Sequence, residues 1–364
     1  MVRTVITFLI LLIGITLSFS DTIAETKWTV LRDDDIIRGD GIQGMLHDVH
    51  FWDNQNGLVI GDSGLMLVTA DGGKTWTKKE VNMRPPGATT GQRPGRPPGA
   101  GGPPAGFGGG GSPTLYNIYF VNEKVGYITG ARGTILKTED NGKTWNRKIA
   151  RSEAAGQNNN PRRGGIRANL MGIQIINETV GFIVGSENTI LKTTDGGETW
   201  VGRSERARVG ETRNNLEDIW FVTPTTGWIV GSYGTLLHTT DGGETWEKRE
   251  AGFDNNLFGI YFFDEKTGWI CGQEGLILHT NDGKTWNQQK TGSIDNLHDI
   301  IFVDNMIGWT VGDYSAVLHT TDGGKTWGAS KAGGSGTLKG VYATDKNHCW
   351  TVDDWGVISA YKTK

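Results

Sequence analysis

The sequence predicts an all-β chain that folds as a seven-bladed β-propeller of four-stranded antiparallel blades. An eight-residue phrase recurs six times, and a longer unit of four short strands recurs around it. A strand-like segment near the N-terminus supplies the one strand that the last unit lacks. Fifty-six Gly and fourteen Trp among 364 residues agree with this repetition, because each unit brings its own turns and its own indole.

The repeated phrase has the form Thr-x-Asp-Gly-Gly-x-Thr-Trp. It occupies residues 69–76, 138–145, 193–200, 239–246 and 320–327, and a form one residue shorter occupies 280–286. An Asp before Gly-Gly can accept backbone N–H bonds, and glycines adopt positive φ without steric cost. The phrase therefore predicts a hairpin turn whose Asp and Trp are structural: Asp71 and Trp76, Asp140 and Trp145, Asp195 and Trp200, Asp241 and Trp246, Asp282 and Trp286, and Asp322 and Trp327.

The longer unit begins with a strand of the form Leu-x-(Asp/Asn/Gly)-Ile/Val-x-Phe, with looser versions at 170–175 and 338–343. Seven such strands begin at Leu46, Leu115, Leu170, Leu216, Leu257, Leu297 and Leu338. A second strand of the form Gly-aromatic-x-Val-Gly follows, then a third strand, the turn phrase, and a fourth strand that starts at the Trp of the phrase. Where nothing is inserted, the first strands lie 40 or 41 residues apart, which is the spacing of propeller blades.

The ends of the chain explain why seven first strands accompany only six turn phrases. The last unit has three strands, at 338–343, 350–352 and 357–361, and residues 27–30 (Lys-Trp-Thr-Val) resemble an orphan fourth strand. Pairing this N-terminal strand with the last unit would close the ring and remove its open edge. We therefore expect one propeller over residues 25–364, with the seventh blade shared between the two ends.

Three segments fall outside the repeat. Residues 1–20 combine Arg3 with an apolar run and small residues, as in a signal peptide for export to the periplasm or the extracellular space. An uncleaved membrane anchor is the alternative for this segment. Residues 84–113 are rich in Gly and Pro, and we expect a disordered insertion there. Residues 151–168 are expected to form a second loop insertion.

The turn phrase resembles the Asp-box, also called the bacterial neuraminidase repeat. The longer unit, with Gly-Trp-x-Val-Gly before the phrase, is similar to the photosystem II assembly and stability factor family of cyanobacteria and plastids. The resemblance covers residues 25–364 apart from the insertions. It implies an exported or lumenal seven-bladed propeller without catalytic activity, which binds newly made photosystem polypeptides and helps them assemble.

The acidic and histidine residues of the repeats predict neither a catalytic site nor a metal site. Repeated Asp side chains are spread around a ring, so they cannot converge on one substrate. His238, His279 and His319 share one strand position, and the chain shows no Cys/His spacing of the zinc type. We therefore expect no catalytic residue, no metal and no cofactor.

Basic residues cluster on one predicted face instead. In a propeller the second-to-third turns and the blade-to-blade connections share the face opposite the Asp-boxes. The first three blades would present Lys148 and ten arginines there: Arg132, Arg147, Arg151, Arg162, Arg163, Arg167, Arg203, Arg206, Arg208 and Arg213. Across the ring the same turns carry Glu274, Asp313, Asp353 and Asp354, with Tyr233, Tyr314 and Trp355 near them. The alternatives are solvated loop charge and a polarised docking face that binds a partner through arginines and aromatic anchors.

The sequence thus predicts an exported, monomeric, non-catalytic propeller that binds a protein or peptide client and helps to assemble or stabilise a membrane or envelope complex. The alternatives are a carbohydrate-active enzyme, like a sialidase or another glycosidase, and a glycan-binding module without catalysis. A sialidase also needs an arginine triad and a Tyr–Glu pair, which this sequence does not allow us to place. A net charge of −4 gives no case for nucleic acid, which is also a poor partner for an exported protein.

Overall fold

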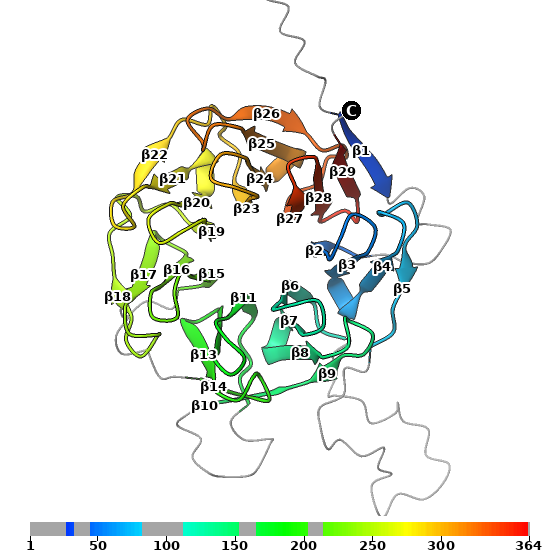
Figure 1. The fold of residues 1–364 in the computed structure, drawn as a ribbon, viewed down its shortest axis with the longest axis vertical. Helices are drawn as coiled ribbons and strands as arrows, with labels where there is room; N and C mark the ends of the chain where they lie inside the picture. Colours follow the sequence, from blue (N-terminus) through cyan, green and yellow to red (C-terminus); the bar gives the residue numbers. More distant parts are fainter. Residues whose placement is uncertain (1–26, 33–43, 82–111, 153–164, 203–213, 363–364) are drawn as a thin grey trace, which may run out of the picture.

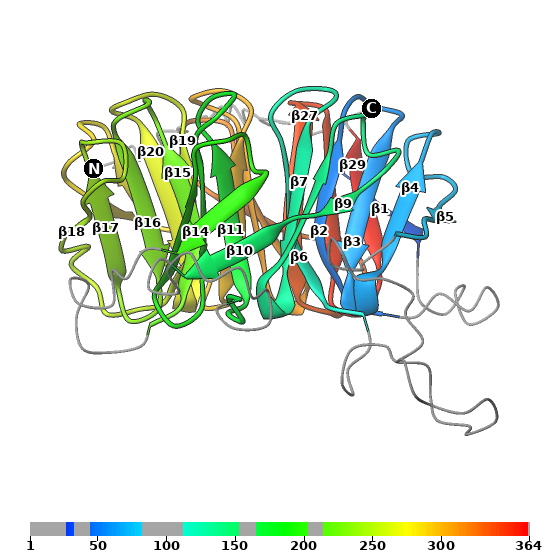
Figure 2. The same cartoon turned by 90° about the horizontal axis from the view of Figure 1, so that it is seen from below.

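The computed structural model shows seven β-sheets arranged in a ring (Figure 1). It describes residues 27–32, 44–81, 112–152, 165–202 and 214–362. Seen from the side, the strands stand along the axis of the ring (Figure 2). The predicted seven-bladed propeller of four-stranded antiparallel blades is confirmed. The expected signal peptide and the 84–113 insertion, except for its last two residues, lie outside the described residues.

Blades 1 to 7 are numbered in the order of their first strands along the chain. The first strand of each blade lies nearest the centre of the ring (Figure 1). The first strands are β2 (Leu46–Phe51), β6 (Leu115–Phe120), β11 (Leu170–Ile175), β15 (Leu216–Phe221), β19 (Leu257–Phe262), β23 (Leu297–Phe302) and β27 (Leu338–Asp345). The second strands are β3 (Gly57–Gly61), β7 (Gly126–Gly130), β12 (Gly181–Gly185), β16 (Gly227–Gly231), β20 (Gly268–Gly272), β24 (Gly308–Gly312) and β28 (His348–Asp353). All seven first strands begin where the sequence predicted.

The third and fourth strands complete each sheet towards the outside of the ring. The third strands are β4 (Met66–Thr69), β8 (Thr134–Thr138), β13 (Thr189–Thr193), β17 (Thr235–Thr239), β21 (Ile277–Thr280), β25 (Ala316–Thr320) and β29 (Ile358–Lys362). The fourth strands are β5 (Thr77–Lys78), β9 (Asn146–Arg147), β14 (Thr199–Gly202), β18 (Glu247–Lys248), β22 (Asn287–Gln289), β26 (Gly328–Lys331) and β1 (Lys27–Arg32). Most fourth strands begin after the Trp of the turn phrase, and only β14 contains it, so they are shorter than predicted.

The ring closes between the two ends of the chain. Strand β1 pairs antiparallel with β29, and Trp28 lies opposite Tyr361 in this register. The rings of these two residues lie 5.5 Å apart, and both pack on a cluster that includes Trp309. The predicted sharing of the seventh blade is confirmed.

One strand departs from the prediction. The sequence suggested only a loop from residue 151 onwards, but β10 (Ile149–Ser152) adds a fifth strand to blade 3 by pairing in parallel with β14. Arg151 also forms an isolated bridge with Gly165 across the insertion. Because β10 follows directly from the fourth strand of blade 2, the chain ties two neighbouring blades together at the outer wall.

The core lies between the blades. Among the described residues, buried side chains form seven clusters, and each cluster spans two neighbouring blades. At the junction of blades 3 and 4, Phe182 stacks on Phe221 with ring centroids 5.0 Å apart. The indole of Trp246 meets Phe221 edge-on at 5.7 Å. The Trp of the turn phrase therefore covers its own hairpin and also fills the joint with the preceding blade, a favourable edge-to-face geometry.

The two glycines that bound each second strand have steric causes. At Gly227 a Cβ atom would lie 2.7 Å from the ring of Phe221. At Gly231 it would lie 2.2 Å from the carbonyl oxygen of Asn215. Both positions of the motif Gly-aromatic-x-Val-Gly therefore require Gly, because the second strand passes close to the first strand of the same blade at each of them.

The six turn phrases form the predicted hairpins. In the copy at 239–246, the Asp241 carboxylate accepts hydrogen bonds from the Thr239 hydroxyl (2.7 Å), the Thr245 N–H (2.9 Å) and the Thr245 hydroxyl (2.6 Å). These bonds hold the pKa of Asp241 well below its usual range. The same set recurs at Asp71, Asp140, Asp195 and Asp322, and in a shortened form at Asp282.

Candidate functional site

The propeller has two faces of different construction. On one face, the second-to-third turns lie between the connections that join successive blades. The Ser232 N–H donates to the Asn215 carbonyl at the start of its own blade, and the Gly234 N–H donates to the Asn255 carbonyl of the next connection, both at 2.9 Å. These turns and connections are called the connection face here. The opposite face, formed by the Asp-box turns and the first-to-second turns, is called the box face.

Each second-to-third turn has one residue at its tip. In blades 1 to 6 the tip residue has a left-handed φ between 54° and 59°: Ser63, Arg132, Glu187, Tyr233, Glu274 and Tyr314. Four of these turns form short 3-10 helices, η1 (Asp62–Gly64), η2 (Ala131–Gly133), η5 (Gln273–Gly275) and η6 (Asp313–Ser315). Trp355 holds the corresponding place in blade 7 by sequence alignment.

Three of the tips are aromatic and point into solvent. Tyr233 is 73% exposed, Tyr314 is 71% exposed and Trp355 is 58% exposed. Soluble proteins expose single apolar residues everywhere, but these three recur at one structural position on one face. The three aromatic residues thus lie on the face that the sequence indicated, and their role as anchors stays a prediction.

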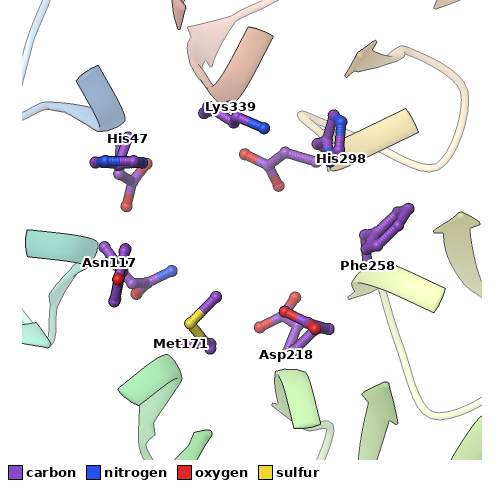
Figure 3. A pocket seen from close by; sticks show the side chains of 11 residues that line it. His47, Asn117, Met171, Asp218, Phe258, His298 and Lys339 are labelled. Atoms are coloured by element: carbon purple, nitrogen blue, oxygen red, sulfur yellow. The ribbon is translucent and has the colours of Figure 1, made fainter. Parts of the chain in front are cut away.

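The mouth of the central channel forms a cavity of about 330 Å³ (Figure 3). Every blade contributes the second residue of its first strand to the lining: His47, Tyr116, Met171, Glu217, Phe258, His298 and Lys339. The third residue also lines it where that residue is Asp or Asn, as at Asp48, Asn117, Asp218 and Asp299. The cavity is therefore built from all seven blades.

A β-bulge explains how two consecutive residues can line the same cavity. Side chains normally alternate between the two faces of a strand. In each of the seven first strands the pairing register shifts between the first and third residues, for example between Leu216 and Asp218. A bulge of this kind re-aims side chains and is common near functional sites.

The three channel carboxylates link neighbouring blades. The Asp48 carboxylate accepts the Ile118 N–H of blade 2 at 2.7 Å, and the Asp299 carboxylate accepts the Val341 N–H of blade 7 at 2.8 Å. Asp218 forms the equivalent bond to blade 5. Burial inside the ring raises the pKa of Asp218 to about 7 and that of Asp299 to about 6.

Two histidine–aspartate pairs stand at the edge of the channel mouth. His47 Nε2 lies 2.9 Å from Asp62 Oδ1 in blade 1, and His298 Nε2 lies 2.8 Å from Asp313 Oδ1 in blade 6. Burial lowers the pKa of His298, and this outweighs the opposite effect of Asp313. Each imidazole is thus held against the second-to-third turn of its own blade. Within the described ranges, no group of three His, Cys, Asp or Glu side chains is placed to bind a metal.

The histidines of the third strands have a packing role. The rings of His238, His279 and His319 lie 4.0, 5.1 and 4.8 Å from the Trp of the adjacent second strand. Cys271 and Cys349 are both free and buried. These residues behave as strand residues of the repeat.

The structure places some of the predicted arginines on the connection face. Arg132 is the exposed tip of the blade 2 turn, and the Gly133 N–H of that turn donates to the Ala168 carbonyl at 2.8 Å. This bond brings exposed Arg167 next to the same turn. Arg151 is also exposed, but it lies in β10 on the outer wall of blade 3 and not on the connection face. Six further predicted residues lie outside the described residues: Arg162, Arg163, Arg203, Arg206, Arg208 and Arg213.

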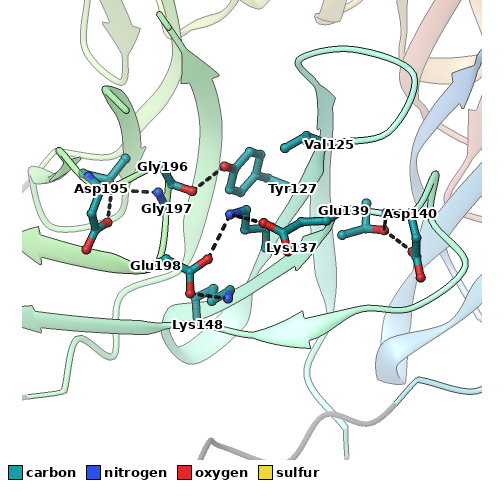
Figure 4. Close-up of polar contacts among 12 residues, drawn as sticks. Val125, Tyr127, Lys137, Glu139, Asp140, Lys148, Asp195, Gly196, Gly197 and Glu198 are labelled. Atoms are coloured by element: carbon teal, nitrogen blue, oxygen red, sulfur yellow. Dashed lines mark hydrogen bonds and ion pairs between the residues drawn. The ribbon is translucent and has the colours of Figure 1, made fainter. Parts of the chain in front are cut away.

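Two further basic residues lie away from the connection face, on which the sequence placed them. Arg147 belongs to β9 on the outer wall of blade 2. The Nζ of Lys148 lies 2.7 Å from a carboxylate oxygen of Glu198, which belongs to the Asp-box turn of blade 3 (Figure 4). Lys137 binds the other oxygen of Glu198 at 2.9 Å. These contacts join blades 2 and 3 and direct Lys148 away from the connection face.

The channel carboxylates were missed by the sequence-based prediction. The available signal was the third residue of the first strand, which is Asp, Asn or Gly in all seven units. The reason for this restriction is visible at Gly172, Gly259 and Gly340, where an added Cβ would lie 2.9, 3.4 and 3.0 Å from the Cα of an Asp in the next blade. Asp and Gly thus alternate across these junctions.

The chain matches the family model of the Photosynthesis system II assembly factor YCF48 over residues 36–89 and 205–292, which together are less than half of its length. A comparison with curated protein sequences found no match. Among solved structures, YCF48 bound to D1 peptide is 16% identical with a TM-score of 0.64, covering 93% of this chain and 97% of that chain. YCF48 from Cyanidioschyzon merolae is also 16% identical with a TM-score of 0.64, covering 92% of this chain and 98% of that chain.

A propeller of another kind is almost as similar in shape. The WD40 beta propeller domain of Doa1 is 12% identical with a TM-score of 0.62, covering 93% of this chain and 98% of that chain. At such identities the structural similarity shows the fold alone. The family-model match confirms the predicted resemblance to the photosystem II assembly factors.

Proposed function

We propose that this YCF48-like propeller is an exported, non-catalytic assembly factor that binds a protein client on its connection face. The observation that carries the proposal is the contrast between the two faces. The connection face presents exposed aromatic and charged side chains on turns fixed by backbone hydrogen bonds, whereas the repeated carboxylates of the box face are used inside their own turns. Preorganised turns lose little entropy on binding, which favours affinity.

The comparisons support a polypeptide client. The family model describes an assembly factor, and one of the similar structures is a YCF48 with a bound D1 peptide. We propose an equivalent class of client for this chain, a segment of a membrane or envelope complex. Arg132 and Arg167 would pair with carboxylates of that segment, since guanidinium groups bind carboxylates in bidentate geometry.

Several observations favour a binding role over catalysis. The Asp-box carboxylates are fully engaged within their hairpins and are distributed around the ring. The channel carboxylates accept backbone N–H groups of two blades, as a structural link does. A glycosidase would need two carboxyl groups about 5–10 Å apart with distinct acid and base roles.

A glycan-binding module is the second candidate, and the three exposed aromatic tips favour it, because flat aromatic rings can stack on the C–H face of a sugar. Binding of the purified protein to a glycan array, without release of sugar, would support this alternative. Release of sugar that is lost in Glu217→Gln would instead establish the glycosidase.

Export is part of the proposal and rests on residues 1–20. Expression of the full chain in its host, followed by fractionation and N-terminal sequencing, tests it. A mature N-terminus between residues 20 and 27 in the periplasmic or extracellular fraction is expected. Recovery of the uncleaved chain in the cytoplasm would contradict export without affecting the binding proposal.

Client capture tests the binding proposal. The tagged protein should capture a defined protein from the solubilised envelope of its host. Charge reversal of two connection-face arginines (Arg132→Glu, Arg167→Glu) should reduce that capture at least tenfold. The matched control reverses two exposed lysines of the box face (Lys143→Glu, Lys325→Glu) and should capture normally. Equal capture by both double variants would reject the connection face as the binding site.

A further inference from the structure

We propose that the half of the connection face on blades 4 to 7 binds lysine or arginine side chains of the client. The inference rests on the proposed function and adds the chemistry of the bound segment. The surface consists of three exposed aromatic tips and three acidic residues between them, and it is called the aromatic–acidic arc here: Tyr233, Asp254, Glu274, Asp295, Tyr314 and Trp355.

The arc is continuous, because hydrogen bonds join each tip to the next connection. The Tyr233 N–H donates to Asn256 Oδ1 at 2.9 Å, which places the tip of blade 4 beside the connection that carries Asp254. The Gly275 N–H, next to Glu274, donates to the Asp295 carbonyl at 2.8 Å.

The same linkage continues into the last two blades. The Ser315 N–H, next to Tyr314, donates to the Gly336 carbonyl at 2.8 Å, and the Asp354 N–H donates to the Thr337 carbonyl at 3.0 Å. The Trp355 N–H donates to Asp353 Oδ1 at 2.9 Å. The six residues of the arc thus follow one another around the face on a fixed backbone.

The fold gains nothing from aromatic side chains at these tips. Tyr233 and Tyr314 both have φ of 54°, a left-handed conformation that is uncommon and unfavourable for a bulky residue. Both residues are more than 70% exposed, so burial does not offset this strain. Exposed, rigid rings of this kind are typical anchors for a binding partner.

The charge of the arc is negative. Asp254, Glu274 and Asp295 form no ion pair with any described residue. Exposed Ile294 lies beside Asp295 and adds apolar surface. The adjacent channel mouth adds further carboxylates, including Glu217.

Lys331, Lys290 and Lys339 are lysines that lie close to the arc. Lys331 donates through Nζ to the Tyr314 carbonyl at 2.6 Å, so its charge already sits against the turn of an aromatic tip. Lys290 is exposed just after β22 at the start of a blade connection, and Lys339 lines the channel mouth. None of the three forms an ion pair with the acids of the arc within the described residues.

A cationic side chain fits both components of this surface. A guanidinium or ammonium group over a Trp or Tyr ring is attracted by the electrons of the ring face, and a nearby carboxylate adds a charge-assisted hydrogen bond. The opposite half of the face carries Arg132 and Arg167, which would repel such a group. The client segment is therefore expected to lie with its basic residues on blades 4 to 7 and its acidic residues on blades 2 and 3.

Defined peptides test the inference directly. The probes are three fluorescein-labelled twelve-residue peptides of Gly-Ser-Xaa repeats, in which Xaa is Arg, Gln or Glu, measured by fluorescence anisotropy at low salt. The Arg peptide should bind at least tenfold more tightly than the Gln peptide, and the Glu peptide should not compete for its site. Binding should weaken as salt is raised, because exposed charges are screened.

Variants locate the binding. Tyr314→Ala with Trp355→Ala, and separately Glu274→Gln with Asp295→Asn, should each weaken Arg-peptide binding at least fivefold. A box-face control with the same loss of charge, Glu123→Gln with Glu178→Gln, should leave it unchanged. Melting temperatures of all variants show whether the fold is retained, and the two arc variants act on different side chains, so a folding defect in one leaves the other informative.

Several results would overturn the inference. One is equal affinity for the Arg and Gln peptides. Another is unchanged binding of the Arg peptide in both arc variants. A third is that the arc variants lose binding to a glycan while they still bind the Arg peptide normally. If client capture still depends on Arg132 and Arg167, the proposed function survives such a result. If capture depends on neither half of the connection face, the proposed function itself fails.

Discussion

The carboxylate of Asp218 in blade 4 accepts a hydrogen bond of 3.0 Å from the backbone N–H of Ile260 in blade 5. Asp48 and Asp299 form the same link between blades 1 and 2 and between blades 6 and 7. The innermost strands of neighbouring blades have no ladder of hydrogen bonds between them. These side-chain bonds are therefore direct polar links between the innermost strands of neighbouring blades.

The titration of Asp218 predicts a pH-dependent effect of Asp218→Asn. The folded pKa of about 7 lies above the ordinary value of 3.8, because burial disfavours the charged form. The folded protein thus binds more protons than the unfolded chain, and this contribution to stability, complete below about pH 4, is lost as the pH rises through 7. The variant lacks this titration. Between pH 5 and pH 8 its unfolding free energy should therefore rise relative to that of wild type by on the order of 2 kcal/mol, which melting temperatures of the two proteins would show.

The comparison must be made between the two proteins, because histidines act in the opposite sense. Burial lowers the pKa of His50 from its ordinary value of 6.5 to about 3, so this group adds stability as the pH rises between these two values. That effect is common to both proteins and cancels in the difference. A difference in melting temperature that stays constant from pH 5 to pH 8 would contradict the raised pKa.

Gly172→Ala should destabilise the junction between blades 3 and 4. The added Cβ would lie 2.9 Å from the Cα of Asp218, and the backbone of Glu217 and Asp218 leaves little room to relax. Overpacking of this kind costs about 1–3 kcal/mol in unfolding free energy. Denaturant titration measures it, and Gly165→Ala is the control, because nothing lies within 4 Å of a Cβ at that position. Equal stability of the two variants would show that the junction can widen without cost.

Asp241→Ala should destabilise the hairpin of blade 4 by about 1–3 kcal/mol, because three hydrogen bonds to its carboxylate are lost. Client capture at a temperature where the variant is folded should be unaffected, since this residue lies on the box face. Glu250→Ala is the control, because its contact with Lys248 at 3.4 Å is exposed and weak. Lost capture in the folded Asp241→Ala protein would place function on the box face.

Trp28→Ala should loosen the closure of the ring. The indole is half-buried against Tyr361, and its removal should cost about 1–3 kcal/mol in unfolding free energy. Exposure of the β29 edge should also promote self-association, which light scattering would detect. Thr29→Ala on the same strand is exposed and should behave like wild type. If Trp28→Ala unfolds at the wild-type denaturant concentration and stays monomeric, β1 is dispensable for closure.

Local chemistry made most of the fold predictable. The Asp241 turn and the Gly227 and Gly231 positions depend on contacts within one blade, so each repeat carries its full signal. Closure through Trp28 was also predictable, because six turn phrases against seven first strands left a single vacancy. The parallel strand β10 was not predictable, since its pairing with β14 joins two blades across an insertion.

The candidate site was only partly predictable for a similar reason. Tip residues such as Tyr314 lie at fixed positions of the repeat, so their face followed from topology. The channel mouth needed the bulge beside Asp218, which places two consecutive side chains on one side of a strand and breaks the alternation that the sequence suggests. The position of Lys148 depended on Glu198 in the next blade, which no single repeat contains.

Site-specific crosslinking tests the central claim that clients bind the connection face. A photoreactive amino acid is placed in turn at Tyr233, Tyr314 and Arg132, and at Lys143 and Lys325 on the box face, and the protein is illuminated in the envelope of its host. We predict that the three connection-face positions give an adduct with one shared client and that the box-face positions do not. Adducts from the box-face positions alone would contradict the account.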